Sequence, residues 1–305
     1  MYHVSRYLTS KFTSHSHSFS KMIGNYHTIM KIIIVLAAFT ALSSAVQWND
    51  LRVKWSGTDL FRLNSFFKVP RESKNAFIEG WVSVPGVNDH PVTVYCFKDD
   101  GRFCILTDSY GNIAGFQVGA RARDVENEKI PYKPSTFPAY KKKNLFGEDF
   151  WTVTVYTVDP DVIDVGGRRD AGGLTGTTGI WIEEGDSYKA ISRNLDTMLK
   201  TLDFHEENCV AKMGTHYYYA MNESLVCEEF YPIFLLYEDG DLLGLGFQVF
   251  GASSKVSRNW YEWVPSLFIR PTIPNSPQCL VDWTAKYGLI SMHVYFVDKP
   301  WKISC

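Results

Sequence analysis

The stretch YPIFLLYEDGDLLGLGFQVFGA, residues 231–252, decides how this chain folds. Two apolar runs flank an acidic turn that ends at Gly240, which is the pattern of a β-hairpin. A shorter version, VYCFKDDGRFCILTDSYGNIAGFQVGA, occupies residues 94–120. Each copy is followed by a variable region and then by a β-rich run containing Val-Asp, WTVTVYTVDP at 151–160 and LISMHVYFVDKP at 289–300. The chain therefore contains two copies of one β unit.

Short apolar runs separated by Gly-containing turns, roughly every ten residues, are typical of all-β domains. We predict a mostly β protein built from two related antiparallel β-sandwich-like units, residues 46–163 and 209–305. Residues 164–208 connect them, first as a glycine-rich linker and then as one short helix at 187–202. Apolar residues spaced three and four apart favour that helix.

Three smaller expectations concern single segments of the two units. The alternating segment 46–68 is expected to supply edge strands to the first unit, and AFIEGWVSV at 76–84 reads as a further strand. In the second unit, the proline-rich segment 270–277 reads as a loop.

Charge argues against nucleic acid as a partner. The 305 residues carry a net charge of −2, but residues 1–45 hold four Lys or Arg and no acidic residue. The remainder has 27 basic and 33 acidic residues, a net charge of −6. A mildly acidic surface lacks the basic face that phosphate binding needs.

The N-terminus has the pattern of a secretory signal peptide at residues 30–45. Lys31 precedes the apolar run 32–42, and Ser43-Ser44-Ala45 provides small residues for cleavage. This run is shorter than the roughly 20 residues a membrane-spanning helix needs, so we expect no membrane span. Residues 1–29 read as an over-extended start; a long leader or a mitochondrial presequence are the alternatives. We predict an extracellular, secreted protein.

The cysteines fit that compartment. All six lie after residue 45, and an even number in an oxidising environment predicts three disulfides with fifteen possible pairings. The least contorted pairing is local, and it joins Cys96 to Cys104, Cys209 to Cys227 and Cys279 to Cys305. A cysteine metal site is not favoured because no C-x-x-C pair is present.

Two histidines beside methionines form a candidate metal site. Met213 stands three residues before His216, and Met292 precedes His293. Imidazole with thioether is a copper-type ligand set, although zinc also accepts histidine. Aligning the endings of the two units places Thr154 opposite His293, so this histidine belongs to one copy. The alternative is that His293 makes a buried structural hydrogen bond.

Aromatic clusters suggest a different kind of site. Tyr217, Tyr219, Trp260 and Trp263 could stack on a sugar or a protein partner, or pack in the core. Asn222 begins an N-x-S glycosylation acceptor. Neither a G-x-S-x-G elbow nor an H-E-x-x-H motif is present, so no catalytic residue is predicted.

Three segments carry a resemblance to a family. MGTHYYY at 213–219, FLLYEDGDLLGLGF at 234–247 and SMHVYFVD at 291–298 are similar to secreted proteins of insects and other invertebrates. That family shares MG-x-H-Y and S-M-H-x-Y motifs, has no assigned activity and includes members found in venom or saliva. The resemblance covers mainly residues 205–305, more loosely 76–165, and implies a secreted protein.

We therefore expect a non-enzymatic binding or secretion-fluid protein without a cofactor, whose partner is an extracellular protein or a glycan. One alternative is a metal-dependent oxidative enzyme that holds copper or zinc at His216 and His293. Another is a carbohydrate-binding protein that uses the tyrosines and tryptophans named above.

Overall fold

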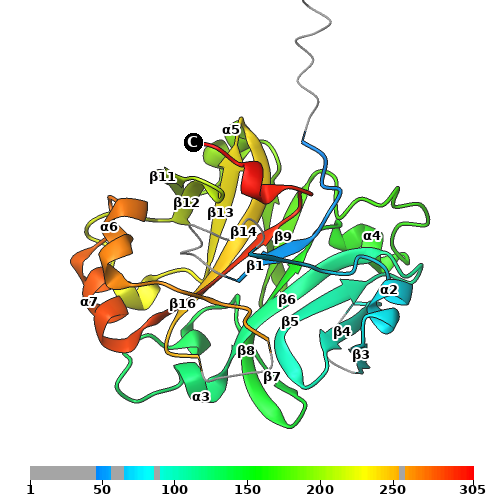
Figure 1. Cartoon of the computed structure of the whole chain (residues 1–305), viewed down its shortest axis with the longest axis horizontal. Helices are drawn as coiled ribbons and strands as arrows, with labels where there is room; N and C mark the ends of the chain where they lie inside the picture. Colours follow the sequence, from blue (N-terminus) through cyan, green and yellow to red (C-terminus); the bar gives the residue numbers. More distant parts are fainter. Residues whose placement is uncertain (1–45, 56–64, 86–89, 254–257) are drawn as a thin grey trace, which may run out of the picture. The chain divides into compact units, whose positions relative to one another are not determined.

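The computed structural model describes the chain from residue 46 onward with three gaps, namely as residues 46–55, 65–85, 90–253 and 258–305. The segment Val46–Cys305 forms one compact unit. Its described strands assemble into two antiparallel sheets of eight strands each (Figure 1). The prediction of a mostly β protein with two related units is confirmed. The predicted over-extended start and signal peptide, residues 1–45, lie outside the described residues.

The first sheet has the order β10-β9-β8-β6-β5-β4-β3, with β7 beside β8. Its strands are β3 (Trp81–Val84), β4 (Thr93–Phe97), β5 (Asp100–Thr107), β6 (Ile113–Arg121), β7 (Lys141–Leu145), β8 (Glu148–Tyr156), β9 (Gly179–Glu184) and β10 (Ser187–Ser192). The second sheet has the order β11-β12-β13-β14-β16-β1-β2, with β15 beside β16. Its strands are β1 (Arg52–Lys54), β2 (Phe66–Lys68), β11 (Phe204–Val210), β12 (Gly214–Tyr219), β13 (Ile233–Glu238), β14 (Asp241–Phe250), β15 (Glu262–Trp263) and β16 (Leu289–Tyr295).

The two sheets are copies of one plan. From β1 and again from β9, the chain passes through a hairpin, a short helix, four consecutive strands, an accessory strand and a last strand. Each hairpin joins the sheet of the other copy, because β1 pairs with β16 and β9 pairs with β8. The expectation that residues 46–68 supply edge strands to the first unit is therefore wrong. Sequence adjacency suggested it, whereas the hairpins are exchanged.

The acidic turn of the opening stretch adopts the conformation of a tight hairpin turn. Glu238 pairs with Asp241 across the two residues Asp239 and Gly240, whose φ angles of 50° and 82° are both positive. A two-residue turn with positive φ matches the twist of the strands β13 and β14 that it joins. The hairpin prediction for this stretch is confirmed.

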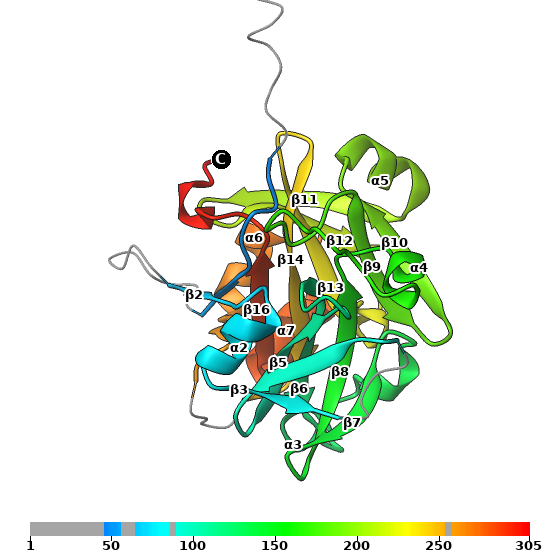
Figure 2. The same ribbon diagram turned by 90° about the vertical axis from the view of Figure 1, so that its right-hand side faces the viewer.

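Several short helices connect the described strands. They are α2 (Ser73–Ile78), α3 (Ala122–Val125), α4 (Pro160–Asp164), α5 (Leu195–Thr201), α6 (Ile269–Thr272) and α7 (Gln278–Tyr287), with 3₁₀ turns η1 (Pro134–Thr136), η2 (Cys227–Glu229), η3 (Ser266–Phe268) and η4 (Pro300–Lys302). Within this unit, α6 and α7 lie together on one flank, and α2 and α4 lie on the other (Figures 1 and 2).

The predicted helix at 187–202 is wrong in its first half. Ser187–Ser192 is strand β10, which forms a hairpin with β9 around Gly185. The helix α5 begins at Leu195, because the Asn194 side chain caps it by accepting a hydrogen bond from the Thr197 backbone N–H at 3.0 Å. The apolar spacing across 187–202 therefore combined a strand residue with helix residues.

Two further predictions are corrected. The strand expected at 76–84 begins as helix α2, which gives way at Gly80 (φ 79°) to the shorter strand β3. The loop expected at 270–277 includes most of helix α6, and the ten-residue helix α7 that follows was not predicted. In each case packing against the sheets outweighs the weak local signal.

The core lies between the two sheets. Phe116 of the first sheet lies 6.2 Å from Phe296 of the chain after β16, and Tyr140 lies 6.2 Å from Phe247 of β14 (ring centroids). The Tyr261 hydroxyl donates a hydrogen bond of 2.5 Å to the Gly119 carbonyl across the interface. Burying each such phenylalanine contributes about 1.5–3 kcal/mol. The residues of one face of each sheet are thus committed to stability.

Three disulfides join the six cysteines in the described part of the chain. They are Cys96–Cys104, Cys209–Cys305 and Cys227–Cys279. The predicted bridge across the first hairpin is confirmed, and the other two predicted pairings are wrong.

The tertiary fold explains the correct pairing. The turn after β11 lies against the C-terminal segment, where the Lys212 N–H donates a hydrogen bond of 2.9 Å to the Ile303 carbonyl, so Cys209 meets Cys305. Helix α7 carries Cys279 back to Cys227 in η2. Proximity in sequence did not anticipate either return of the chain.

Candidate functional site

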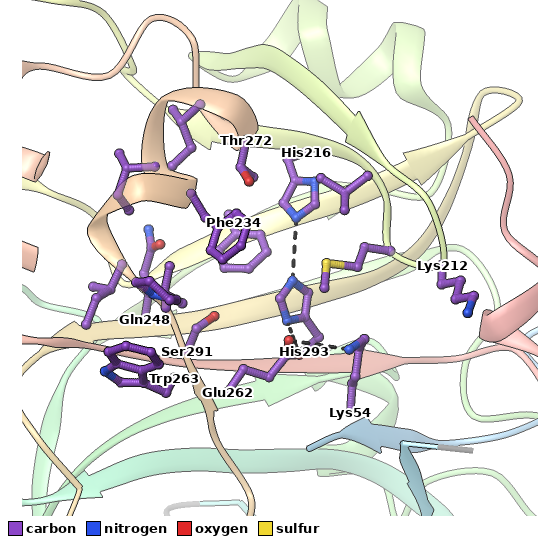
Figure 3. A pocket seen from close by; sticks show the side chains of 18 of the residues that line it. Lys54, Lys212, His216, Phe234, Gln248, Glu262, Trp263, Thr272, Ser291 and His293 are labelled. Carbon is purple, nitrogen blue, oxygen red and sulfur yellow. Dashed lines mark hydrogen bonds and ion pairs between the residues drawn. The ribbon is translucent and has the colours of Figure 1, made fainter. Parts of the chain in front are cut away.

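A cavity of about 440 Å³ lies on the outer face of the second sheet, which is the face turned away from the core (Figure 3). Strands β12, β13, β14 and β16 contribute its floor, and β15, η3 and α6 contribute to its wall. Most of its lining side chains are apolar. Polar groups enter it from His216, His293, Glu262 and Lys54.

Glycine on the central strand makes room for this cavity. Gly246 of β14 pairs with Phe234 on one side and with His293 on the other. The Phe234 ring lies over Gly246, so that a methyl group there would overlap the ring. The LGLG run within 231–252 therefore has a function: the missing side chain of Gly246 lets side chains from neighbouring strands meet above β14.

The two predicted histidines meet in this space. Nε2 of His216, from β12, lies 3.5 Å from Nε2 of His293, from β16 (Figure 3). The exposed fractions of the two residues are 1% and 5%. The Phe234 ring packs against both, with centroid distances of 5.4 Å and 5.1 Å. Two strands separate β12 from β16 in the sheet, so this meeting is a tertiary feature.

A backbone carbonyl orients His216. Its Nδ1 lies 3.0 Å from the Gly214 carbonyl oxygen. Because a carbonyl accepts, the proton of the neutral ring lies on Nδ1, and Nε2 presents a lone pair to the cavity. Gly214 has a φ of 99°, which a side chain would strain. The MG-x-H pattern is thus explained: glycine adopts the turn whose carbonyl directs the histidine.

A buried carboxylate orients His293. Glu262 Oε1 lies 2.7 Å from His293 Nδ1, close but not aligned for a straight hydrogen bond. Glu262 Oε2 forms an ion pair of 3.4 Å with Lys54 Nζ, and both side chains are at most 5% exposed. Glu262 pairs with Ser291 on β16, and Lys54 pairs with His293 from β1. Three strands therefore build this end of the cavity.

The protonation states follow from burial and neighbours. Burial and, to a smaller extent, the neighbouring His293 lower the pKa of His216 to about 3, although the backbone contacts with Asn208 and Gly214 offset part of the effect. Burial alone would raise the pKa of Glu262, but the nearby His293 and Lys54 outweigh it and hold that pKa below its usual value. At neutral pH His216 is neutral and Glu262 is ionised.

These shifts predict how stability depends on pH in metal-free protein. Since the pKa of His216 is about 3 when folded and near 6.5 when unfolded, the unfolded chain binds the extra proton as pH falls. Stability should be full above about pH 6.5 and decline toward pH 3, by about 2 kcal/mol between pH 7 and pH 5 from this residue. Urea unfolding across a pH series measures it.

The control for that series is the exposed His205 of β11. His205→Gln should keep the decline, whereas His216→Gln should flatten it between pH 6.5 and 5; an unchanged slope in His216→Gln would contradict the assignment. Glu262 adds a further loss below about pH 4.5, because its pKa is lowered on folding. The other charged or titratable groups facing this cavity are His293, Lys54, Lys212 and Tyr218.

The two methionines are placed differently. Met213 lines the cavity with both histidines, and the Tyr295 hydroxyl donates a hydrogen bond of 3.2 Å to its carbonyl. Met292 is fully buried in the core, because it alternates with His293 along β16 and points to the opposite face. No group of three His, Cys, Asp or Glu side chains that could hold a metal occurs in the described residues.

The four aromatic residues do not share one surface. Trp260 is fully buried between the sheets, where Nε1 donates a hydrogen bond of 2.9 Å to Asp100. Tyr217 is buried, and its hydroxyl donates a hydrogen bond of 2.9 Å to Glu206. Tyr219 is half-buried beneath Lys189. Trp263 is 76% exposed and lines the cavity.

The glycosylation acceptor lies on the surface. Asn222 is exposed, and its Oδ1 accepts hydrogen bonds from the backbone N–H and the hydroxyl of Ser224.

The predicted alignment of the last strands of the two units, which placed Thr154 opposite His293, needs correction. Gly246 pairs with His293, and its counterpart Gly115 pairs with Tyr156, so Tyr156 and not Thr154 occupies the place of His293 in the first sheet.

Sequence reasoning missed Glu262 and Lys54. Glu262 stands between Trp260 and Trp263 and belongs to no motif, and Lys54 alternates with apolar residues as a solvent-facing side chain would. No short pattern links residues 208 positions apart, so the ion pair is visible in the folded chain alone.

None of the helices within the described ranges has the length and hydropathy needed to cross a membrane. No protein-family model matches the chain, and neither a curated protein nor a solved structure matches it.

Proposed function

We propose that this chain is a secreted protein of an extracellular fluid, such as venom, saliva or haemolymph, and that it binds a small, largely apolar molecule without transforming it. The cavity on the outer face of the second sheet carries this proposal. Its volume of about 440 Å³ lies within the range of roughly 300–1,000 Å³ of small-molecule sites.

The charges in the cavity favour a neutral ligand. The Glu262 carboxylate already forms an ion pair with Lys54 and contacts Nδ1 of His293, and His216 is neutral. At the histidine end an ionised ligand would lose its hydration beside charges that are already paired, which is costly. Lys212 is the remaining cation in the lining. A molecule with an apolar body and one hydrogen-bonding group directed at the histidines fits best.

The secretion part of this proposal is supported by the disulfides. Three bridges and no free cysteine in the described residues suit an oxidising compartment. A glycan or protein partner bound through the aromatic side chains receives less support, since Trp260 and Tyr217 are buried.

Blocking the cavity tests the proposal. Thr272 lines it from α6, so Thr272→Phe should fill space that a ligand would occupy. N-phenyl-1-naphthylamine, a neutral apolar fluorophore, should bind one molecule per chain, and the substitution should weaken binding by about tenfold or more. Fluorescence titration measures both quantities.

The matched control places the same side chain on the same helix but outside the cavity. Arg270 is exposed, and Arg270→Phe should leave probe binding within about twofold. Absence of saturable binding, or an equal loss in the two variants, would overturn the proposal. Saturable binding of an oligosaccharide in place of the probe would favour the carbohydrate alternative.

A further inference from the structure

The inner end of the cavity has the features of a metal site. Its ligand set differs from the usual cluster of three or more His, Cys or carboxylate groups. Both imidazoles direct Nε2 into the same small volume, and their Nδ1 atoms face acceptors that lie outside it. Two convergent lone pairs at one point repel each other unless a proton or a cation lies between them.

The distance separates these two options. The Nε2–Nε2 distance of 3.5 Å exceeds the usual 2.7–3.2 Å range of a hydrogen bond donated by N–H. Two nitrogens bound to one ion at about 2.0–2.1 Å and 3.5 Å apart subtend an angle of about 113–122°, near the tetrahedral and trigonal values. The geometry fits a shared ion better than a shared proton.

The surroundings of each ring have the form found around metal ligands. Metal-binding histidines almost always use the other ring nitrogen to contact a carboxylate or a backbone carbonyl. His216 contacts the Gly214 carbonyl in this way, and His293 contacts the Glu262 carboxylate. Glu262 is itself held by Lys54, so the orientation is supported through a further layer.

The third ligand available is a thioether. Met213 lines the same cavity three residues before His216. The cysteines are all bridged, and Glu262 faces Nδ1 rather than the convergent nitrogens. Two imidazoles with a thioether suit copper, whereas zinc normally takes further thiolate, histidine or carboxylate ligands.

We infer that His216, His293 and Met213 bind one copper ion at the inner end of the cavity, with Gly214 and Glu262 orienting the two rings. The remaining coordination position faces the cavity, where a small ligand would meet the ion. This site goes beyond the proposed binding of an apolar molecule and does not depend on it. It is also what an oxidative enzyme at this position would require.

Copper titration tests the inference. Protein with intact disulfides is first treated with a chelator and then titrated with Cu(I) against a chromophoric competitor. One Cu(I) per chain is expected, and His216→Asn and His293→Asn should each reduce the affinity by more than about 100-fold. Glu262→Gln should reduce it by about 10- to 100-fold through ring orientation. His205→Asn, on an exposed histidine of β11, should leave it unchanged.

The methionines provide a second, gentler pair of variants. Met213→Leu should weaken Cu(I) binding and remove the sulfur shell from the copper X-ray absorption spectrum, while Met292→Leu should do neither. Near-ultraviolet circular dichroism shows whether the histidine variants fold. If they do not, the two methionine variants and the X-ray absorption spectrum of the wild-type protein still test the inference. Less than one equivalent of bound copper, or equal losses in His205→Asn and His216→Asn, would overturn the inference.

Different experimental results would contradict the ligand proposal and the copper proposal. Thr272→Phe should block the apolar probe but leave Cu(I) binding within about twofold. Chelated protein should still bind the probe. Loss of copper binding in Thr272→Phe would show that the ion and the ligand do not occupy separate positions, and would overturn the placement given above.

Discussion

Replacing Glu262 with alanine is expected to lower the free energy of unfolding by about 3–5 kcal/mol. The carboxylate is almost fully buried and pairs with Lys54 and His293. Removing it takes away the carboxylate that forms an ion pair with the buried Lys54 ammonium, and breaking a buried ion pair from one side is costly. Guanidinium unfolding followed by tryptophan fluorescence measures the change.

The double variant Lys54→Met, Glu262→Leu is the test of the cause. Replacing both charged groups with apolar side chains should restore at least about half of the lost stability, because no buried charge remains. As a surface control, Asp298→Ala breaks an exposed contact with Lys299 and should cost less than about 1 kcal/mol. A loss in Glu262→Ala no larger than in the control would contradict the burial argument.

Removing the bridge between Cys209 and Cys305 should be at least as damaging. It closes a loop with a sequence separation of 96, for which chain entropy predicts a cost of about 4–5 kcal/mol. The paired variant Cys209→Ala, Cys305→Ala should also free the C-terminal segment that contacts Lys212 beside Met213. Urea unfolding and copper affinity should therefore decline together.

The first-hairpin bridge is the matched comparison. Cys96 and Cys104 are separated by 8 residues, so Cys96→Ala, Cys104→Ala should cost only about 2–3 kcal/mol by the same relation. This bridge lies in the other sheet, away from the cavity, and copper affinity should not change. Equal losses from the two bridges would show that loop length does not govern their contributions.

The duplicated plan and the single cavity are connected through particular residues. Gly115 and Gly246 hold the same place in β6 and β14, but Gly115 pairs with Tyr156 and Gly246 pairs with His293. The first sheet therefore lacks the histidine from its last strand, and its frame carries no equivalent pair. The two sheets share the frame, and the second sheet carries the histidine pair at this position.

The alternation of side chains along strands and the residues typical of turns allowed the hairpins to be predicted from the sequence. The hairpin at 231–252, its earlier version at 94–120, and the bridge between Cys96 and Cys104 all rest on contacts within about ten residues. Such contacts depend on local patterning that a linear sequence displays. The predictions that combined a strand with a helix, at 187–202 and 76–84, overlooked turns at Gly185 and Gly80.

Part of the candidate site could be predicted from the sequence. The sequence singled out His216, His293 and Met213 because histidine and methionine recur in two motifs, and the structure places these three at one cavity. It included Met292 wrongly among side chains that face this cavity, since alternation along β16 sends it into the core. Glu262 and Lys54 gave no local signal.

By itself, the sequence determined the β class, the repeated hairpin and the residue types able to bind a ligand, because these follow from side-chain period and turn geometry. Tertiary structure alone decided that the hairpins exchange between sheets, that Cys209 meets Cys305, and that His216 meets His293 above Gly246. The last two of these pairings join residues 96 and 77 positions apart, respectively. They depend on sheet order and packing, which the spacing of residues along a chain does not encode.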